Sequence, residues 1–232
     1  MVYPEQCLMC PTLVERAGGL CADCWRQTPF LSGLVCDTCG ASLPGKDDGA
    51  GVICDECLSM PRPWQAGRAV FAYRDLGRRM VLALKHGDRT DLAAPAAGWM
   101  QVAGRSFLTP DTALAPIPVH WSRLLSRRYN QAAELARALS RRTGMDCFPD
   151  ALVRVKRTPA QDGMSVAERI HNVTGAMAVN PRRRGALAGR KVCLIDDVMT
   201  SGATLSAATK AARDAGVDHV FVLTLARVEK IP

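Results

Sequence analysis

The sequence lacks any apolar run that approaches the roughly 18 residues of a membrane-spanning helix, which predicts no membrane insertion. Its first residues, M-V-Y-P-E-Q, carry neither a basic nor an apolar segment, so no secretory signal is expected. It has only 4 histidines, and these show no metal-ligand spacing. We therefore expect a cytoplasmic protein, in a compartment where paired cysteines usually bind metal or do redox work.

Cysteine, by contrast, is concentrated at one end: eight of the 10 cysteines lie before residue 58, as four C-x-x-C pairs. The pairs are Cys7/Cys10, Cys21/Cys24, Cys36/Cys39 and Cys54/Cys57. A two-residue gap directs both sulfurs at one tetrahedral ion, and two pairs complete a Cys₄ zinc site. One such pair is also typical of a thioredoxin-like redox centre, but four pairs without a βαβ pattern favour two structural Zn²⁺ ions over redox or disulfide chemistry. Sequential pairing closes the shortest loops, and interleaved pairing is the alternative.

Charge divides the chain at the same place. Residues 1–64 contain 4 Lys+Arg and 8 Asp+Glu, a net of −4, whereas the remainder contains 26 and 14, a net of +12. The prolines of M-P-R-P-W discourage helix and indicate an extended linker. We predict a double zinc-knuckle module at 1–60, a linker at 61–64 and a larger domain at 65–232.

The larger domain contains one motif that predicts a ligand site, K-V-C-L-I-D-D-V-M-T-S-G-A-T at 191–204. Val192 to Ile195 fit a central strand, and Asp196 and Asp197 are expected where the backbone leaves the sheet. The following turn, Thr200 to Thr204, leads into a helix over 205–215, so backbone N–H groups and a helix N-terminus point at one spot. A phosphate held beside two carboxylates indicates a sugar phosphate. The alternative is an ordinary strand-to-helix turn with Thr200 or Ser201 as N-cap.

Apolar segments with strand and helix periodicity alternate through the rest of this domain. Strands are predicted at 68–73, 113–119, 152–155, 174–179, 192–195 and 217–226, with helices over 76–84, 92–103 and from 135 onward. This alternation predicts an α/β fold in which helices cover both faces of a parallel sheet. Ligands bind outside the carboxyl ends of such strands, where the acidic pair is expected.

Residues 192–204 closely resemble the ribose-phosphate signature of type I phosphoribosyltransferases. Further matches are the N-terminal cysteine module, F-A-Y, L-K-H-G-D, P-I-P-V-H, R-R-Y-N-Q-A-x-x-L-A, and Gln161 with R169-x-x-N172. Together they make nearly the whole chain similar to the ComF family of competence proteins. Arg128 stands where that family usually has Gly, and Gly reaches backbone conformations that Arg avoids.

The resemblance implies a type I phosphoribosyltransferase-like sheet preceded by a zinc-ribbon-like module, and a role in natural DNA uptake. It implies a site for phosphoribosyl pyrophosphate and Mg²⁺, with Asp196 and Asp197 as catalytic residues. The ribose and phosphate would contact Asp196, Asp197, Thr200, Ser201, Gly202, Ala203 and Thr204. The pyrophosphate loop and the hood over the site would supply Arg123, Arg127, Arg128, Arg157, Gln161, Arg169 and Asn172. For each arginine, plain solvation on a loop is the alternative.

Two functions remain open from the sequence. Purine-salvage members of the superfamily have an Asp base where Thr200 stands, and Thr takes no proton at neutral pH, so ligand binding without transfer is favoured. The net charge of +12 would attract a phosphate backbone, and Trp121 and Tyr129 lie among the arginines. We therefore expect a DNA-uptake accessory protein that binds a ribose phosphate and single-stranded DNA, at the inner face of the cytoplasmic membrane beside a helicase-like translocase. The alternative is an active phosphoribosyltransferase of nucleotide metabolism with an unidentified acceptor.

Overall fold

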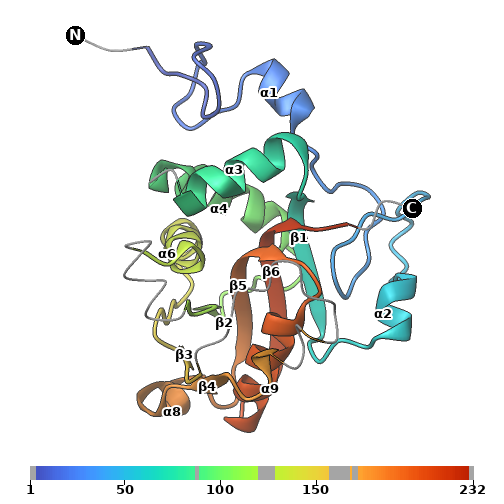
Figure 1. Ribbon diagram of the computed structural model, residues 1–232, viewed down its shortest axis with the longest axis vertical. Helices are drawn as coiled ribbons and strands as arrows, with labels where there is room; N and C mark the ends of the chain where they lie inside the picture. Colours follow the sequence, from blue (N-terminus) through green and yellow to red (C-terminus); the bar gives the residue numbers. More distant parts are fainter. Residues whose placement is uncertain (1–3, 87–88, 120–128, 157–167, 169–171, 230–232) are drawn as a thin grey trace.

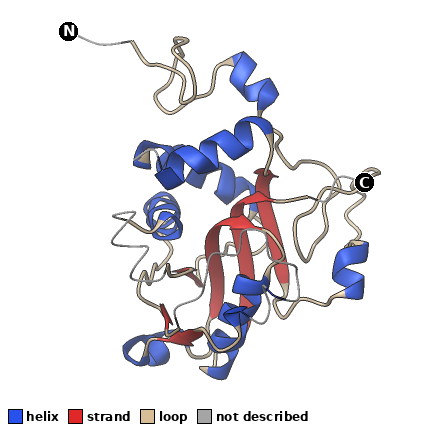
Figure 2. Ribbon diagram, viewed as in Figure 1, coloured by secondary structure: helices blue, strands red, loops and turns tan. Residues whose placement is uncertain are grey.

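A parallel sheet lies at the centre of the computed structural model, which describes residues 4–86, 89–119, 129–156, 168 and 172–229. Its four described strands have the order β1-β6-β5-β2 (Figures 1 and 2). The strands are β1 (Ala66–Ala72), β2 (Thr112–Pro116), β3 (Leu152–Arg154), β4 (Met177–Val179), β5 (Lys191–Met199) and β6 (His219–Arg227). The helices are α1 (Ala22–Gln27), α2 (Asp55–Ser59), α3 (Asp75–His86), η1 (Thr90–Leu92), α4 (Ala93–Ala103), α6 (Gln131–Thr143), η2 (Pro181–Arg183), α8 (Arg184–Leu187) and α9 (Ala203–Asp214). The predicted fold class is therefore confirmed.

The two faces of the sheet carry separate hydrophobic cores, because side chains alternate along each strand. Cys193 and Ile195 of β5 face a core shared with α3, α4 and α6. Val192 and Leu194 face a second core shared with α9 and with Cys36, Cys39, Cys57 and Trp64. A cysteine-rich segment thus covers part of the face that a helix would cover in an ordinary doubly wound sheet.

The helices form where the sequence has apolar spacing and suitable ends. In α3, Leu76, Met80, Val81 and Leu84 are buried on one side of the helix. The Asn130 side chain caps α6 by accepting from the Ala132 N–H, and Gly144 ends it in the left-handed conformation. Apolar periodicity predicted both helices, the second from residue 135 onward; the structure adds its start at Gln131 and the two capping residues.

Loops cover both edges of the sheet. The Leu31 N–H donates to the Val70 carbonyl at 2.9 Å, so the segment after α1 runs along β1. On the other edge, the Leu114 N–H donates to Asp146 and the Phe148 N–H to Leu114. Since unpaired strand edges invite aggregation, these contacts protect the sheet.

Two sequence predictions about strands were wrong. The strands predicted at 152–155 and 174–179 do not join the parallel sheet; β3 and β4 pair with each other as a separate antiparallel sheet. The motif strand also does not end before Asp196, since β5 pairs with β6 as far as Met199. Periodicity identifies a strand but not its partner, and a carboxylate at a strand end does not prevent backbone pairing.

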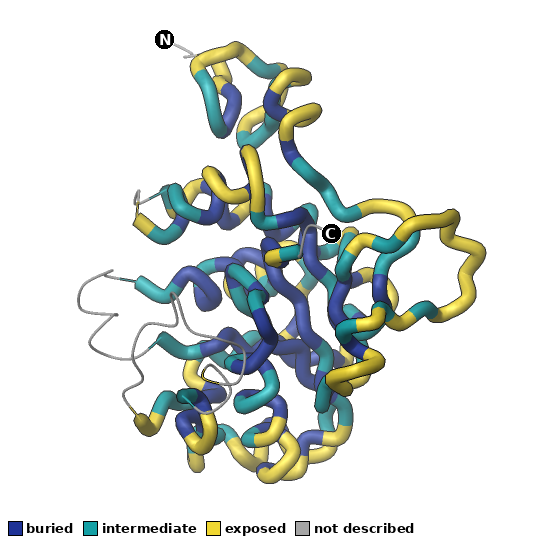
Figure 3. The backbone as a smooth tube through the Cα atoms, turned by 45° about the vertical axis from the view of Figure 1, so that its right-hand side comes forward, coloured by how far each residue is buried: buried dark blue, intermediate teal, exposed yellow. Residues whose placement is uncertain are grey.

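The two halves of the cysteine-rich segment lie in different places. Figure 1 shows α1 at the top, next to α3, and α2 at the right, beyond β1. The N-terminal part is largely exposed, whereas the sheet is largely buried (Figure 3). The division into residues 1–60, 61–64 and 65–232 stays a prediction.

Candidate functional site

The eight paired cysteines form two clusters of four sulfurs. Within each cluster the sulfur atoms all lie within 4.8 Å of one another. One cluster contains Cys7, Cys10, Cys21 and Cys24, and the other contains Cys36, Cys39, Cys54 and Cys57. The structure thus favours the sequential pairing over the interleaved one.

The geometry of both clusters fits Zn²⁺. The sulfurs of Cys10 and Cys21 are 3.6 Å apart, as are those of Cys39 and Cys54. Tetrahedral zinc with bonds of about 2.3 Å requires sulfurs about 3.8 Å apart. The backbone N–H of Cys21 also donates to the Cys7 sulfur, and that of Cys54 to the Cys36 sulfur. The donor set and spacing support a structural zinc in each cluster.

The clusters differ in what they pack against. In the first, Cys7 and Cys24 contact Leu76 at the start of α3. In the second, Cys36 and Cys39 are 0% exposed and lie within the core of the sheet. The second cluster is therefore part of the α/β unit, and the first is attached to its surface.

The acidic pair lies in the carboxyl-terminal part of β5, which ends at Met199. Asp197 is 9% exposed and its Oδ2 lies 3.3 Å from Lys85 Nζ on α3. Side-chain alternation explains the contact, because Asp197 follows Cys193 and Ile195 on the face that α3 covers. Lys85 was missed as a site residue: the sequence indicated it as the end of a helix, within L-K-H-G-D.

The end of α3 that carries Lys85 is held by the segment after the predicted pyrophosphate loop. The Tyr129 hydroxyl donates to the Leu84 carbonyl at 2.6 Å, and Gln131 Nε2 donates to the Lys85 carbonyl at 3.5 Å. These bonds satisfy carbonyls that a helix end leaves without intrahelical partners. Tyr129 thus has a structural role, which disfavours its use as a stacking platform for bases.

The surroundings of Asp196 destabilise the ionised form of its carboxyl group. Burial and the negative charge of Asp197 raise the pKa of Asp196 to about 8. The Asp197 N–H, which donates to Asp196 Oδ1 at 2.9 Å, and the charges of Lys85 and Arg154 act in the opposite direction. Arg154 on β3 is a second charged neighbour that sequence reasoning missed, since nothing in the sequence placed β3 near the motif.

The predicted phosphate turn follows directly. Gly202 is the N-cap of α9 with φ 77°, a conformation that favours glycine, and no side chain caps the helix. The Ala203 N–H donates to Ser201 Oγ at the long distance of 3.5 Å. Neither Thr200 nor Ser201 is the N-cap, so the alternative of an ordinary side-chain-capped turn is not what the structure contains. A glycine N-cap leaves the first N–H groups of α9 to other partners.

The remaining predicted site residues are only partly described. Asn172 is described and half-buried. The others lie outside the described residues, namely Arg123, Arg127, Arg128, Arg157, Gln161 and Arg169. The structure thus brings together Asp196, Asp197 and the turn 200–204, and adds Lys85 and Arg154 to them.

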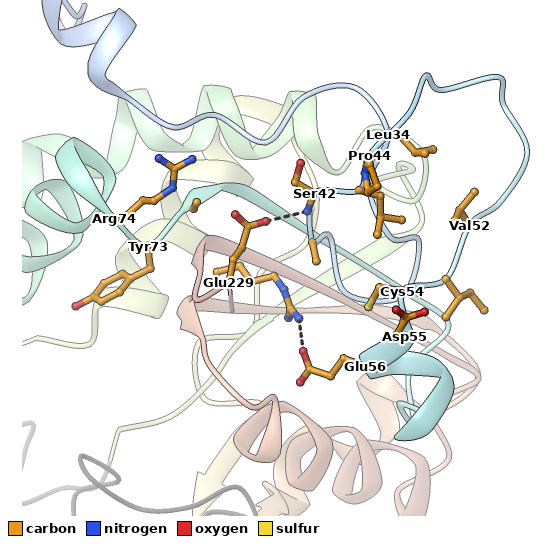
Figure 4. Close-up of a pocket in the computed structure, with 15 residues that line it drawn as sticks. Leu34, Ser42, Pro44, Val52, Cys54, Asp55, Glu56, Tyr73, Arg74 and Glu229 are labelled. Atoms are coloured by element: carbon orange, nitrogen blue, oxygen red, sulfur yellow. Dashed lines mark hydrogen bonds and ion pairs between the residues drawn. The ribbon is translucent and has the colours of Figure 1, made fainter. Parts of the chain in front are cut away.

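A separate cleft of about 940 Å³ lies between the second cysteine cluster and the ends of β1 and β6. Figure 4 shows its mixed lining, with Leu34 and Val52 on one side and Glu56 and Glu229 on the other. Asp196 and Asp197 are not among its lining residues. No helix in the described part of the chain is long and apolar enough to cross a membrane.

The chain is similar to several known proteins. Residues 1–58 match the double zinc ribbon domain family. The chain is 28% identical over 228 residues to competence protein F of Haemophilus influenzae, covering 96% of each chain. It is 27% identical over 213 residues to the DNA utilization protein YhgH of Escherichia coli K12, covering 89% of each. The predicted resemblance is confirmed: the chain is similar to competence and DNA utilization proteins along most of its length.

Among solved structures, the chain is similar to the glutamine phosphoribosylpyrophosphate amidotransferase from B. subtilis, complexed with ADP and GMP. The TM-score is 0.41 and the identity 16%. The match covers 62% of this chain and 30% of that one, so this chain corresponds to less than a third of the enzyme.

Proposed function

We propose that this protein is a DNA-uptake accessory protein whose site at the end of β5 binds phosphoribosyl pyrophosphate or a related ribose phosphate. One observation carries the proposal: two carboxylates and a glycine-capped helix N-terminus occupy the same end of one central strand. The homology to competence and DNA utilization proteins supports the cellular role.

In the proposed complex, N–H groups of residues 200–204 bind the 5′-phosphate, and Asp196 and Asp197 accept hydrogen bonds from the ribose hydroxyls. The raised pKa of Asp196 fits this role, because hydroxyl donors or a divalent cation would stabilise the ionised carboxyl that Asp197 destabilises. Mg²⁺ would neutralise the pyrophosphate when bound. Lys85 supplies a fixed positive charge beside the carboxylates.

The site is better suited to binding than to turnover. Thr200 stands where purine-salvage enzymes have a base, and Asp196 and Asp197 would act on the sugar rather than on an acceptor. The second candidate, an active phosphoribosyltransferase with an unidentified acceptor, requires a base from elsewhere. The pyrophosphate loop and the hood remain proposed to contact the ligand through Arg123, Arg127, Arg128, Arg157, Gln161, Arg169 and Asn172.

Isothermal titration with phosphoribosyl pyrophosphate and Mg²⁺ tests the ligand. We expect wild-type protein to bind and the double variant Asp196→Asn/Asp197→Asn to lose binding, because neutral amides accept sugar hydroxyls less strongly and do not attract Mg²⁺. Asp111→Asn is a matched control, since Asp111 pairs with Lys191 at 3.0 Å next to the first residues of β2 and β5. Equal binding by all three proteins, or none by the wild type, would refute the proposed site. Acceptor-dependent pyrophosphate release that the double variant loses would establish the transferase instead.

We also propose direct binding of single-stranded DNA by the basic larger domain, with a helicase-like translocase as protein partner. Residues from 65 onward hold 26 basic and 14 acidic side chains. Fluorescence anisotropy with an oligothymidylate of about 20 nucleotides should show affinity that falls as salt rises, because phosphate contacts release counterions. A peptide nucleic acid of the same sequence lacks phosphates and should not bind. Salt-independent binding, or none to either oligomer, would contradict direct DNA binding.

A further inference from the structure

Arg62 is a buried arginine that connects the second cysteine cluster to the phosphate turn. Its side chain is 2% exposed, although it lies in the segment predicted as a linker. Nη1 donates to the Ser201 carbonyl at 2.6 Å, and Nη2 pairs with Glu56 Oε1 at 2.8 Å. The guanidinium also lies over the Trp64 ring, 5.9 Å from its centroid.

The contact with Ser201 fixes one peptide group of the turn. In a trans peptide the carbonyl and the next N–H point in opposite directions, so the Gly202 N–H points away from Arg62. That is the side from which an anion would approach the turn. A side chain at Gly202 would be tightly packed, since a Cβ there would lie 3.1 Å from both Arg62 Nη1 and the Trp64 ring. Arg62 and Trp64 therefore pack against the turn on the side of the Ser201 carbonyl.

Arg62 also contacts the segment that carries the second cysteine cluster. Glu56 lies on α2 between two cluster cysteines, Cys54 and Cys57. The second oxygen of Glu56 pairs with Arg227 at 3.1 Å, which fixes α2 to the end of β6 (Figure 4). The indole N–H of Trp64 donates to the Thr38 carbonyl, in the loop between Cys36 and Cys39.

We propose that Arg62 is a positioning residue through which the second cysteine cluster sets the conformation of the phosphate turn. This inference rests on the proposed ligand site, and gives the cluster a role in ligand affinity in addition to stability. The first cluster has a different attachment: its segment reaches the larger domain through Leu76, through Leu8 in the core shared with α3, and through Arg89, which donates to the Leu8 carbonyl.

An arginine suits this position because its planar fork donates from two ends at once. Arg62 uses one end for Ser201 and the other for Glu56. A lysine would keep the charge beside Glu56 but has a single ammonium that cannot reach both partners in the same way. Arg62→Lys is therefore the informative conservative variant, and Arg62→Gln the stronger one.

Arg68→Gln is the matched control. Arg68 also joins the second cysteine segment to the sheet, since it donates to the Asp37 carbonyl and pairs with the Asp37 carboxylate, and Asp37 lies outside the turn. All variants would be checked for two bound zinc ions by elemental analysis. Affinity for phosphoribosyl pyrophosphate with Mg²⁺ and amide hydrogen exchange of the peptide spanning 199–206 would then be measured.

We expect Arg62→Gln and Arg62→Lys to bind this ligand about 10- to 100-fold more weakly, as the loss of one charged hydrogen bond predicts. Exchange at 199–206 should rise in both variants while zinc content stays at two. Arg68→Gln should change neither affinity nor exchange at this peptide.

Unchanged exchange at 199–206 in both Arg62 variants would overturn the inference, whatever the ligand. If the wild type binds no ligand but exchange rises only in the Arg62 variants, the ligand proposal fails and the positioning role stands. If Arg62→Gln fails to fold, Arg62→Lys carries the test, and wild-type exchange and affinity in that variant would overturn the inference.

Discussion

Replacing Cys39 with serine is expected to destabilise the whole α/β unit, whereas replacing Cys10 should affect mainly the N-terminal cluster. Cys39 is 0% exposed and shares a core with Val192 and Leu194 of the central strand. A structural zinc contributes about 10 kcal/mol of apparent folding free energy. Since a domain has a net stability of only about 5–15 kcal/mol, loss of the second zinc should leave much of the protein unfolded at 37 °C.

Zinc content and urea denaturation would measure the difference. Each variant should retain one zinc per chain, but only Cys39→Ser should lose the cooperative transition of the sheet. Cys10 is half-buried, and its cluster packs in a small core with Leu76 rather than with the strands of the sheet, so Cys10→Ser should keep that transition within about 1–2 kcal/mol of wild type. Equal destabilisation by both substitutions would contradict this prediction, because it would show that both clusters contribute equally to the stability of the sheet.

Replacing Asp196 with asparagine is expected to stabilise the ligand-free protein at alkaline pH. Burial and the nearby Asp197 charge raise the pKa of Asp196 from 3.8 to about 8. Between these two values the unfolded chain has lost the proton and the folded chain still holds it, so the stability of the wild type falls as pH rises through this window. An amide carries no charge and avoids that loss. The gain should be on the order of 2 kcal/mol above about pH 8, discounted for partial exposure.

Thermal unfolding of both proteins from about pH 4.5 to about pH 8.5 tests this prediction. The Tm advantage of Asp196→Asn should grow from near zero to roughly 4–8 °C. Asp111→Asn should give no such gain, because the Thr109 hydroxyl and Lys191 lower the pKa of Asp111 to about 2. Asp111 therefore contributes stability above the unfolded pKa, and loses it as pH falls toward about 2. A pH-independent advantage of Asp196→Asn would rule out the raised pKa as its cause.

Much of the candidate site could be predicted from the sequence because its parts are adjacent in the chain. The acidic pair, the glycine and the helix that follows lie within one strand–turn–helix segment, where local rules on periodicity and helix starts apply. The cysteine spacing likewise specified the metal chemistry. Lys85, Arg154 and Arg62 could not be found in this way, since each reaches the motif from a distant part of the chain.

The sequence by itself determined the elements and much of the chemistry of this protein: alternating strands and helices, eight cysteines with the spacing of zinc ligands, and a glycine-containing turn that follows two carboxylates. Only the tertiary structure decided that the second cluster lies in the core of the sheet, that β3 pairs with β4 outside it, and that Arg62 holds the turn through Ser201. The physical reason is that backbone propensity and ligand spacing act over a few residues. Packing and buried charge pairs instead depend on which distant surfaces meet, and period and spacing do not encode that choice.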